Sequence, residues 1–324
     1  MAIKQNSKNK AQFIKAFCFL IFLSLILTGQ KTAFAASWMY AHDAVGDSLD
    51  EHNAGIFEIF GMGIKDDGKN IWVGISSHMG RDGHYKDYSY DSAGNRYVIS
   101  NGNIGWGDIF FDFSGNREFG ISNDNRQLFG VRFAPGNDSK VGVGVYSNVF
   151  GVGVQTENAG YRNFGRHHNT VLSKRGQQQP NNVGHLAWND PYWGERYTNS
   201  SYTESVPNVI ASGNRVGDVI SLDNNSLYAA GFDGGLFQGS QLFGFKFSRS
   251  LFPNGNYIAS LFEECLNDAI ALRGNFDTPV SKIDEVVLTP PPETKPVPEP
   301  SGIIGFVIVG LVGAKRVLKL KHES

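Results

Sequence analysis

The chain has 324 residues, 41% of them hydrophobic, so it is long enough to bury a core and is not disordered throughout. The formal net charge is −2, but residues 1–36 hold five basic and no acidic side chains, and residues 302–324 hold four basic and one acidic. The part between them therefore carries 20 basic against 30 acidic side chains. This acidic body argues against a nucleic-acid partner, because phosphate binding needs a cationic face.

The N-terminal segment is typical of a secretory signal peptide. Four lysines between Lys4 and Lys15 precede an apolar run from Ala16 to Leu27, and the small residues Ala33 and Ala35 then stand two apart. We expect signal peptidase to remove residues 1–35 by cleaving between Ala35 and Ala36. A retained signal anchor is the alternative, although the apolar run is short for a spanning helix.

Cleavage would leave Cys265 as the only cysteine, because Cys18 lies in the leader. No internal disulfide could then form. A lone thiol in an exported protein is usually buried and inert.

Two groups of polar residues near the start of the body could supply metal ligands. Asp43, Asp47 and Asp50 could offer oxygens to calcium, and the segment from His78 through Asp82 to His84 could ligate from a turn. Neither spacing matches the regular calcium loop or the helical zinc-binding histidine pair. Calcium is therefore kept only as a possible cofactor, and no metal ligand is assigned. The adjacent His167 and His168, expected in a polar loop, are a weaker candidate still.

The body reads as short strands separated by glycine-containing turns. Apolar and other residues alternate with a period of two around Phe129, Val143 and Phe245, which puts one set of side chains on one face of a sheet. Turn dipeptides such as Asp67-Gly68 and Asp233-Gly234 separate such runs at hairpin-like intervals. The pattern predicts an all-β fold, a jelly-roll-like β-sandwich in a single domain spanning residues 36–288.

The strand expected from Trp106 to Phe113 places Asp108 and Asp112 on one face. Two carboxylates at i and i+4 of a strand lie about 13 Å apart, which is too far for the pair that hydrolyses glycosides. We therefore expect a solvated face on which Asp108 binds loop amides.

An aromatic loop at residues 185–197 is the main candidate for ligand binding. Sugar-binding surfaces combine flat aromatic rings with polar side chains, and Trp188, Tyr192, Trp193 and Tyr197 would be the sugar contacts. The favoured alternative is that the loop uses these rings to pin itself to the sandwich.

Residues 257–270 carry apolar pairs every four residues, a pattern of an amphipathic helix that conflicts with the all-β prediction. The run Glu263-Glu264-Cys265 inside it could imitate a cysteine-nucleophile site. Consecutive strand residues point to opposite faces, however, so Glu264 and Cys265 would not share a pocket.

The C-terminal part contains three successive features. Residues 289–297 form a proline-rich linker, which cannot continue a helix or a sheet. Pro298, Glu299 and Pro300 follow, then an apolar segment from Gly302 to Ala314, then a basic cluster. The apolar segment is short of the bilayer thickness unless neighbouring residues enter it and the lysines snorkel.

This tail, residues 298–321, resembles the PEP-CTERM sorting signal of exosortase-processed bacterial proteins. The resemblance implies secretion, transient membrane tethering, cleavage near Pro298-Glu299-Pro300 by an exosortase-type membrane protease, and delivery to the cell surface or extracellular polysaccharide matrix. An ordinary C-terminal anchor after a proline-rich stalk is the alternative.

Three further blocks extend the resemblance to a cyanobacterial family of exosortase-dependent surface proteins, at residues 61–68, 105–111 and 217–220. The segment from Glu263 to Asp268 is similar to the closing Glu-Cys-x-Asn-Asp segment of such proteins, where a core strand followed by an Asn-Asp turn is implied. We accordingly expect an exported surface or matrix protein that is not an enzyme. A polysaccharide-binding module and a carbohydrate-active hydrolase are the alternatives.

Overall fold

A computed structural model describes residues 37–49, 55–90, 96–115, 117–175 and 182–276. The predicted leader, the linker and the sorting signal lie outside the described residues, as do Ala35, Ala36 and Pro298–Pro300. Among the described residues, no helix is both long enough and apolar enough to cross a membrane.

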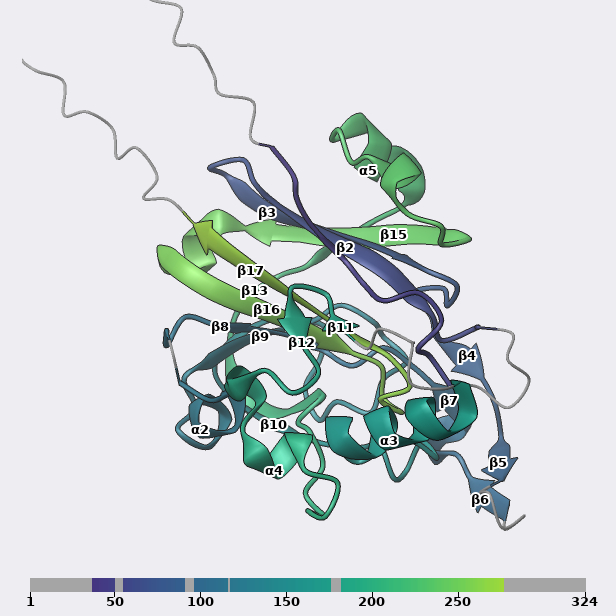
Figure 1. Ribbon diagram of the computed structural model, residues 1–324. Helices are drawn as coiled ribbons and strands as arrows, with labels where there is room; N and C mark the ends of the chain where they lie inside the picture. Colours follow the sequence, from purple (N-terminus) through teal and green to yellow (C-terminus); the bar gives the residue numbers. More distant parts are fainter. Residues whose placement is uncertain (1–36, 50–54, 91–95, 116, 176–181, 277–324) are drawn as a thin grey trace, which may run out of the picture. The chain divides into compact units, whose positions relative to one another are not determined.

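Two antiparallel sheets form the body of the described domain (Figure 1). The strand order of the first sheet is β1 (Met39–His42), β2 (Ile59–Asp66), β3 (Asn70–Ser77), β15 (Gln241–Ser248) and β14 (Ile220–Leu222). The strand order of the second sheet is β13 (Val209–Gly217), β10 (Gly144–Val152), β9 (Leu128–Arg132), β8 (Ile109–Asp112), β16 (Gly255–Phe262) and β17 (Ala269–Phe276). The prediction of an all-β sandwich is confirmed.

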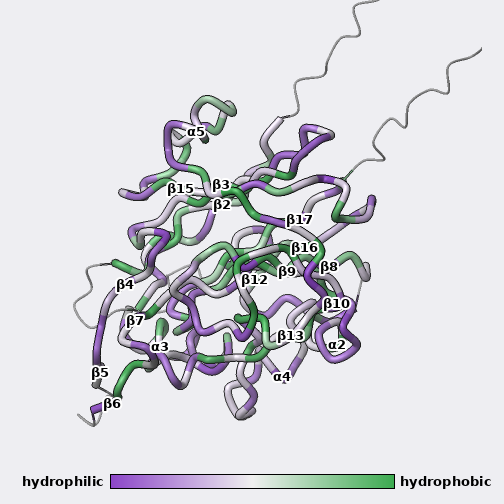
Figure 2. The backbone as a smooth tube through the Cα atoms, turned by 180° about the vertical axis from the view of Figure 1, so that it is seen from behind, coloured by the Kyte–Doolittle hydropathy of each residue, from purple (hydrophilic) through white to green (hydrophobic). Residues whose placement is uncertain are grey.

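The main core lies between these sheets and contains most of the side chains that the period-two pattern had placed on one face; Val143 is an exception, since it is exposed and precedes β10. Phe243, Phe245 and Phe247 of β15 are buried there together with Val131 and Val145 of the second sheet. In the register of the first sheet, Phe245 stands opposite Val73 of β3. Figure 2 shows that hydrophobic stretches concentrate along the strands, whereas the connecting loops are mostly hydrophilic.

The second sheet is buried on both faces, which the sequence analysis did not anticipate. Phe111 of β8 points into the main core, while its neighbour Phe110 belongs to a second apolar cluster on the outer face. That cluster is covered by the helices α2 (Phe119–Asp124), α3 (Phe164–Arg175) and α4 (Glu195–Thr198) and the 3-10 turn η2 (Pro191–Trp193). The prediction of a solvated face at Asp108 and Asp112 is wrong, because both side chains are buried beneath this layer.

The outer face of the first sheet carries a smaller aromatic cluster beside helix α5 (Asn224–Ala229) and the 3-10 turn η3 (Gly234–Leu236). Phe232 packs directly on the backbone of this sheet: a Cβ atom at Gly74 would lie 2.5 Å from its ring, and one at Gly63 would lie 2.7 Å away. The glycines that interrupt these strands thus admit a covering layer of rings.

The remaining described elements are short. They are the strand pairs β4 (His84–Tyr85) with β7 (Asn103–Ile104), β5 (Tyr88–Tyr90) with β6 (Arg96–Val98) and β11 (Asn182–Val183) with β12 (Leu186–Ala187), and the 3-10 turns η1 (Ser100–Gly102) and η4 (Arg249–Leu251).

The segment with the helix-like pattern folds as a hairpin of β16 and β17. Its apolar pairs are explained by the two buried faces of the second sheet: Leu261 faces the main core and Phe262 faces the outer cluster. A core strand followed by a turn is present, but the strand ends at Phe262, earlier than expected, and the Glu-Cys part of the segment belongs to the turn over residues 263–268.

Candidate functional site

The turn between β16 and β17 is the most polar part of the interior. Glu263, Glu264 and Asp268 are all buried there, beside Cys265. Leu266 adopts the left-handed backbone conformation with φ of 52°, which is uncommon for a side chain of this kind. The turn therefore faces inward and brings three carboxyl groups into the protein.

The Glu264 carboxylate links two loops that are distant in sequence. Its Oε2 accepts a hydrogen bond from the Gly105 amide at 2.7 Å, and its Oε1 accepts one from the Asp138 amide at 2.5 Å. Burial, partly offset by these hydrogen bonds, raises the pKa of Glu264 to about 8. Two segments that carry the family resemblance thus contact each other, because Trp106 also forms a β-bridge with Glu263.

Asp108 plays a similar structural part. It accepts hydrogen bonds from the Ile210 amide at 2.6 Å, the Asn137 side chain at 2.8 Å and the Ser139 hydroxyl. Burial raises the pKa of Asp108 to about 6, against the effect of these hydrogen bonds. The expectation that Asp108 binds loop amides is confirmed.

A second acidic group lies on the other side of the turn, where three carboxylates meet. Asp43 and Asp47 come from the loop after β1, and Asp268 comes from the end of the β16–β17 turn; all three are buried, and their ligand oxygens lie within 4.8 Å of one another. Backbone amides fix two of them: Asp43 Oδ1 accepts from Gly184 at 2.8 Å, and Asp268 Oδ2 accepts from Ile59 at 2.7 Å. We call Asp43, Asp47 and Asp268 the acidic trio.

Two more buried carboxylates, Glu58 and Glu263, lie close enough to the acidic trio to interact with it electrostatically. Burial, with repulsion from neighbouring acids, raises the pKa of Asp43, Asp268 and Glu263 well above the usual ranges. Glu58 accepts a hydrogen bond from the Gly46 amide. No lysine or arginine among the described residues forms an ion pair with Asp43, Glu58, Glu263 or Asp268.

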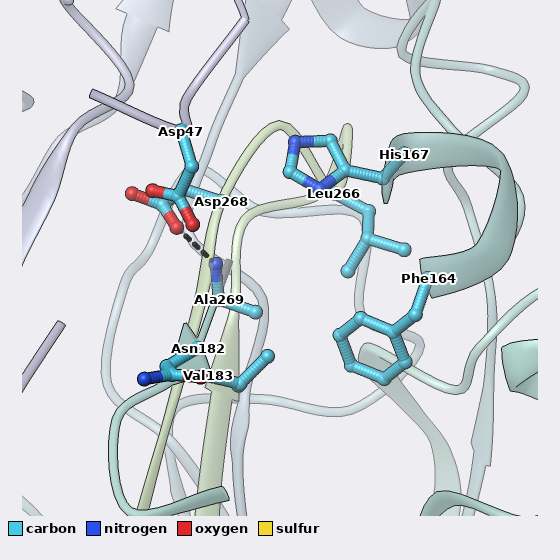
Figure 3. A pocket seen from close by; sticks show the side chains of 8 residues that line it. All are labelled: Asp47, Phe164, His167, Asn182, Val183, Leu266, Asp268 and Ala269. Atoms are coloured by element: carbon cyan, nitrogen blue, oxygen red, sulfur yellow. Dashed lines mark hydrogen bonds between the residues drawn. The ribbon is translucent and has the colours of Figure 1, made fainter. Parts of the chain in front are cut away.

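A small cavity adjoins the acidic trio. Its volume is about 10 Å³, room for about one water-sized guest, and its wall includes Asp47, His167, Asp268, Leu266 and Ala269. Figure 3 shows the His167 ring pointing from α3 across the cavity toward the side of the two carboxylates. Burial lowers the pKa of His167 to about 4, so the imidazole is neutral at pH 7.

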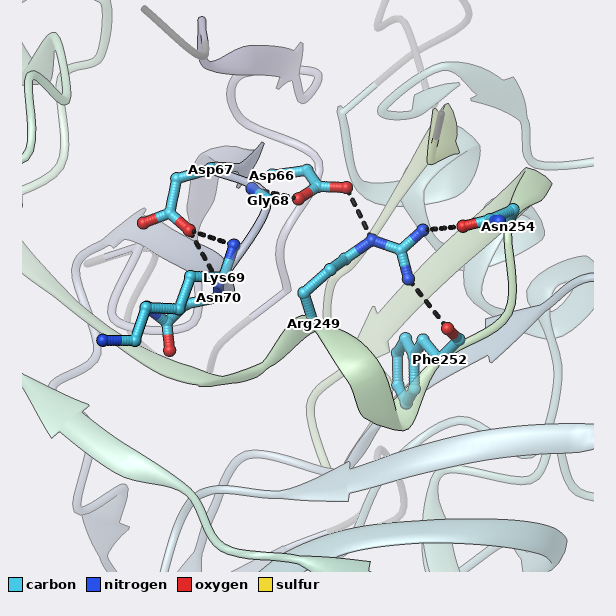
Figure 4. A network of polar contacts seen from close by, with 8 residues as sticks. All are labelled: Asp66, Asp67, Gly68, Lys69, Asn70, Arg249, Phe252 and Asn254. Carbon is cyan, nitrogen blue, oxygen red and sulfur yellow. Dashed lines mark hydrogen bonds and ion pairs between the residues drawn. The ribbon is translucent and has the colours of Figure 1, made fainter. Parts of the chain in front are cut away.

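The negative charge of Asp66 is balanced by an ion pair with the buried side chain of Arg249 (Figure 4). Its Oδ2 lies 2.6 Å from Nε of Arg249, a side chain only 3% exposed. Arg249 also donates to the Phe252 carbonyl at 2.7 Å and to Asn254 Oδ1 at 2.5 Å. The contrast with Asp43 and Asp268 is direct, because neither of these two carboxylates forms an ion pair with a lysine or arginine among the described residues.

The two metal-ligand candidates from the sequence have different outcomes. Asp43 and Asp47 do come together, whereas Asp50 lies outside the described residues. His78, Asp82 and His84 do not form a cluster of ligand atoms in the part of the chain that the structure describes. His78 instead contacts the Ser240 hydroxyl at 3.2 Å, and Asp82 pairs with Arg81.

The aromatic loop is a packing element. The rings of Tyr192, Trp193 and Tyr197 are buried in the outer cluster, so the prediction that they contact sugar is wrong. The indole N–H of Trp193 donates to the Ala187 carbonyl at 3.0 Å. Trp188 is half-buried and stacks on His168 with ring centroids 4.0 Å apart. The alternative, in which the loop pins itself to the sandwich, describes what is observed.

Cys265 is fully buried, and burial raises the pKa of its thiol well above the usual range. The thiol donates to Glu263 Oε2 at 3.7 Å. A nucleophilic cysteine needs an exposed, stabilised thiolate, so this environment is that of an inert core thiol.

Sequence reasoning missed two residues of the acidic site. Asp268 was read only as part of a turn, and His167 was placed in a polar loop, whereas it lies on α3. One signal was present for each: Asp268 stands four residues after the acidic pair 263–264, and His167 lies on a segment with helical apolar spacing from Phe164 to Val171.

Comparison of the chain with protein-family models, with curated proteins and with solved structures gave no match.

Proposed function

We propose that this chain is an exported, non-enzymatic protein of the cell surface or extracellular matrix, delivered by exosortase-type sorting of its C-terminus. The observation that carries the proposal is the presence of both addresses in one sequence: a signal peptide at residues 1–35 and the Pro298-Glu299-Pro300 tail. The proposed partners are signal peptidase, an exosortase-type membrane protease, the membrane during transit and matrix polysaccharide at the destination.

The architecture of the described domain supports a display role. Met39, near its beginning, and Gly274, near its end, line the same open groove of about 400 Å³. The first and last described strands, β1 and β17, also contact each other, so the two ends of the described domain adjoin. A domain held through either end would present its opposite side outward.

The uses of the buried polar groups also favour a structural protein. The carboxylates of Asp108, Glu264 and Asp268 each accept a hydrogen bond from a backbone amide distant in sequence, those of Ile210 in β13, Gly105 in a loop and Ile59 at the start of β2. Such bonds fix loops in place. A carbohydrate-active hydrolase, the catalytic alternative, would instead need two carboxyl groups about 5 to 10 Å apart in an open groove.

The test is mass spectrometry of the protein recovered from the native host. We expect an N-terminus at Ala36 and a C-terminus near Pro298–Pro300, with the protein outside the cell. Replacing Pro298, Glu299 and Pro300 by alanine should leave the chain in the membrane fraction with its basic tail intact. Replacing Pro290, Pro291 and Pro292 by alanine is the matched control and should leave processing unchanged. A cytosolic protein that retains both ends would refute the proposal.

A further inference from the structure

The acidic trio has the dimensions of a cation site. Ca²⁺ binds oxygen ligands at about 2.3–2.6 Å, so two oxygens on one ion are at most about 5 Å apart. The ligand oxygens of Asp43, Asp47 and Asp268 lie within 4.8 Å of one another. Three carboxylates on two separate segments can therefore reach a common ion without movement of the backbone.

Polar atoms around the trio also lack partners. Asp43 Oδ2, Glu263 Oε1 and His167 Nε2 have no hydrogen-bond donor or acceptor among the described residues, although the side chains are only 8%, 0% and 5% exposed. A buried polar atom left without a partner costs about 1–3 kcal/mol; of these three residues His167 lines the cavity itself, so its Nε2 atom points to an occupant there. His167 is independent of the acidic residues, and it faces the trio across the cavity (Figure 3).

Charge leads to the same conclusion. Five carboxyl groups are buried together here: Asp43, Asp47, Glu58, Glu263 and Asp268. An ionised carboxylate in the interior costs several kcal/mol unless a cation compensates it. Arg249 provides that compensation for Asp66. Asp43 and Asp268 form no ion pair with a lysine or arginine of the described residues, so a cation from solution would supply the equivalent compensation.

We propose that Asp43, Asp47 and Asp268 bind one divalent cation, Ca²⁺, at the edge of this cavity, with Glu58 and Glu263 adding negative charge around it. The donor set consists of carboxylate oxygens, which hard cations such as Ca²⁺ prefer, and water or backbone carbonyls complete the coordination. His167 lies beyond the three ligands and orders water at the ion. The alternative occupant is a proton shared by the Asp43 and Asp268 carboxyl groups, which lie within hydrogen-bonding reach of each other.

The ion would join parts of the chain that are distant in sequence. Asp43 and Asp47 follow β1 near the start of the domain, and Asp268 precedes β17 at its end. Through the Gly184 and Ile59 amides, the same carboxylates also hold β11–β12 and the start of β2. The site would therefore stabilise the described domain as a whole.

The experiment uses the purified full-length chain, treated with EDTA and dialysed into metal-free buffer at pH 7.5. Thermal unfolding is followed by circular dichroism with no metal, with Mg²⁺ and with about 5 mM Ca²⁺, a concentration suited to extracellular sites. We expect Ca²⁺ to raise Tm by about 2–9 °C, as for a ligand at about 5 to 50 times its Kd. Elemental analysis after dialysis against Ca²⁺ should find about one calcium per chain.

Asp43→Asn and Asp268→Asn should abolish the Ca²⁺ response. Asn keeps an oxygen for the Gly184 or Ile59 amide and removes one buried charge, so both variants should fold and should gain Tm in the absence of metal. Glu264→Gln is the matched control: it is equally buried and lies in the same turn, but it stands outside the trio, so it should keep the full response.

Three outcomes would overturn the proposal. The first is no calcium in the wild-type protein with no change in Tm, which would leave the shared proton as the occupant. The second is an equal response in Asp43→Asn, which would place the ion elsewhere. The third is a response to Zn²⁺ but not to Ca²⁺, which would refute the identity of the ion. The wild-type measurements decide the first and third even if a variant fails to fold.

Discussion

Trp193→Ala tests whether the aromatic loop is a part of the core. Trp193 is fully buried, and its ring packs against Phe164, Tyr192 and Phe262 with centroid distances of 4.7, 5.0 and 5.9 Å. Truncating a buried tryptophan costs about 3–5 kcal/mol, and loss of the hydrogen bond to Ala187 adds about 1 kcal/mol. We expect a loss of about 4–5 kcal/mol in the free energy of unfolding.

Trp188→Ala is the matched comparison, because it removes the same ring from the same loop. Trp188 is half-buried, and its main contact is the stack on His168 at 4.0 Å. An aromatic pair of this kind contributes about 0.5–1.5 kcal/mol, so we expect a loss of about 1 kcal/mol. If the loop bound sugar instead, both variants should lose polysaccharide retention, and the free energy of unfolding should change little in either.

The assay is urea denaturation of the full-length chain, monitored by far-UV circular dichroism, with the slope m checked for constancy. If Trp193→Ala is too unstable to purify, Trp193→Phe should still show a loss of about 2 kcal/mol, because a ring remains but the hydrogen bond does not. A loss below 1 kcal/mol for Trp193→Ala would refute the packing role. Loss of polysaccharide retention in a stable Trp188→Ala variant would restore the sugar-binding alternative.

Three further results are expected. Between pH 4.5 and about 8, folded Glu264 holds a proton that the unfolded chain has released, so it lowers stability as pH rises, by about 1.4 kcal/mol per pH unit. Glu264→Gln should remove that slope when urea midpoints are compared from pH 5 to 8, and parallel profiles would contradict the assignment. Arg249→Met should cost about 3 kcal/mol, because it leaves the buried Phe252 carbonyl without its donor and the half-buried Asp66 without a cation; a change below 1 kcal/mol in the same assay would show that the network is dispensable. In hydrogen exchange, Ca²⁺ should slow the amides of Gly184 and Ile59, which donate to the acidic trio, and leave that of Gly105, which donates to Glu264, unaffected; equal slowing of all three would indicate global stabilisation without a local site.

The sandwich could be predicted from sequence because its central strands alternate. Phe243, Phe245 and Phe247 have one buried face in the main core, which is the condition under which a period of two is visible. The second sheet broke that condition. Its strands are buried on both sides, so Phe110 and Phe111 are both apolar, and Leu261 next to Phe262 imitates a helix. Burial of the second sheet on both faces cannot be read from a local pattern. It explains why the prediction of a solvated face at Asp108 and Asp112 was wrong and why residues 257–270 have a helix-like pattern.

The acidic site was predictable only in part, for a similar reason. Asp43 and Asp47 are close in the chain, and their spacing drew attention to calcium. Asp268 reaches them because β17 lies beside β1 and β2 at the edge of the domain, which no local spacing reveals. The buried state of Trp193 was equally hidden, since an aromatic loop that covers a sheet and one that binds a ligand have the same composition.

The position of the acidic trio connects its chemistry with export. Without a cation, burial and repulsion between acids raise the pKa values of Asp43, Glu263 and Asp268 well above the usual ranges, so holding these groups ionised lowers the stability of the domain. Sites of the extracellular class fill only at about 10⁻⁴–10⁻³ M Ca²⁺, well above the concentrations that cytosolic sensors detect. If the sorting proposal holds, a chain with such a site would be less stable in the cytosol than outside the cell, where calcium fills the site. The two proposals can nevertheless fail separately: calcium binding by a cytosolic chain would refute the sorting proposal alone, and a correctly sorted chain without calcium would refute the site alone.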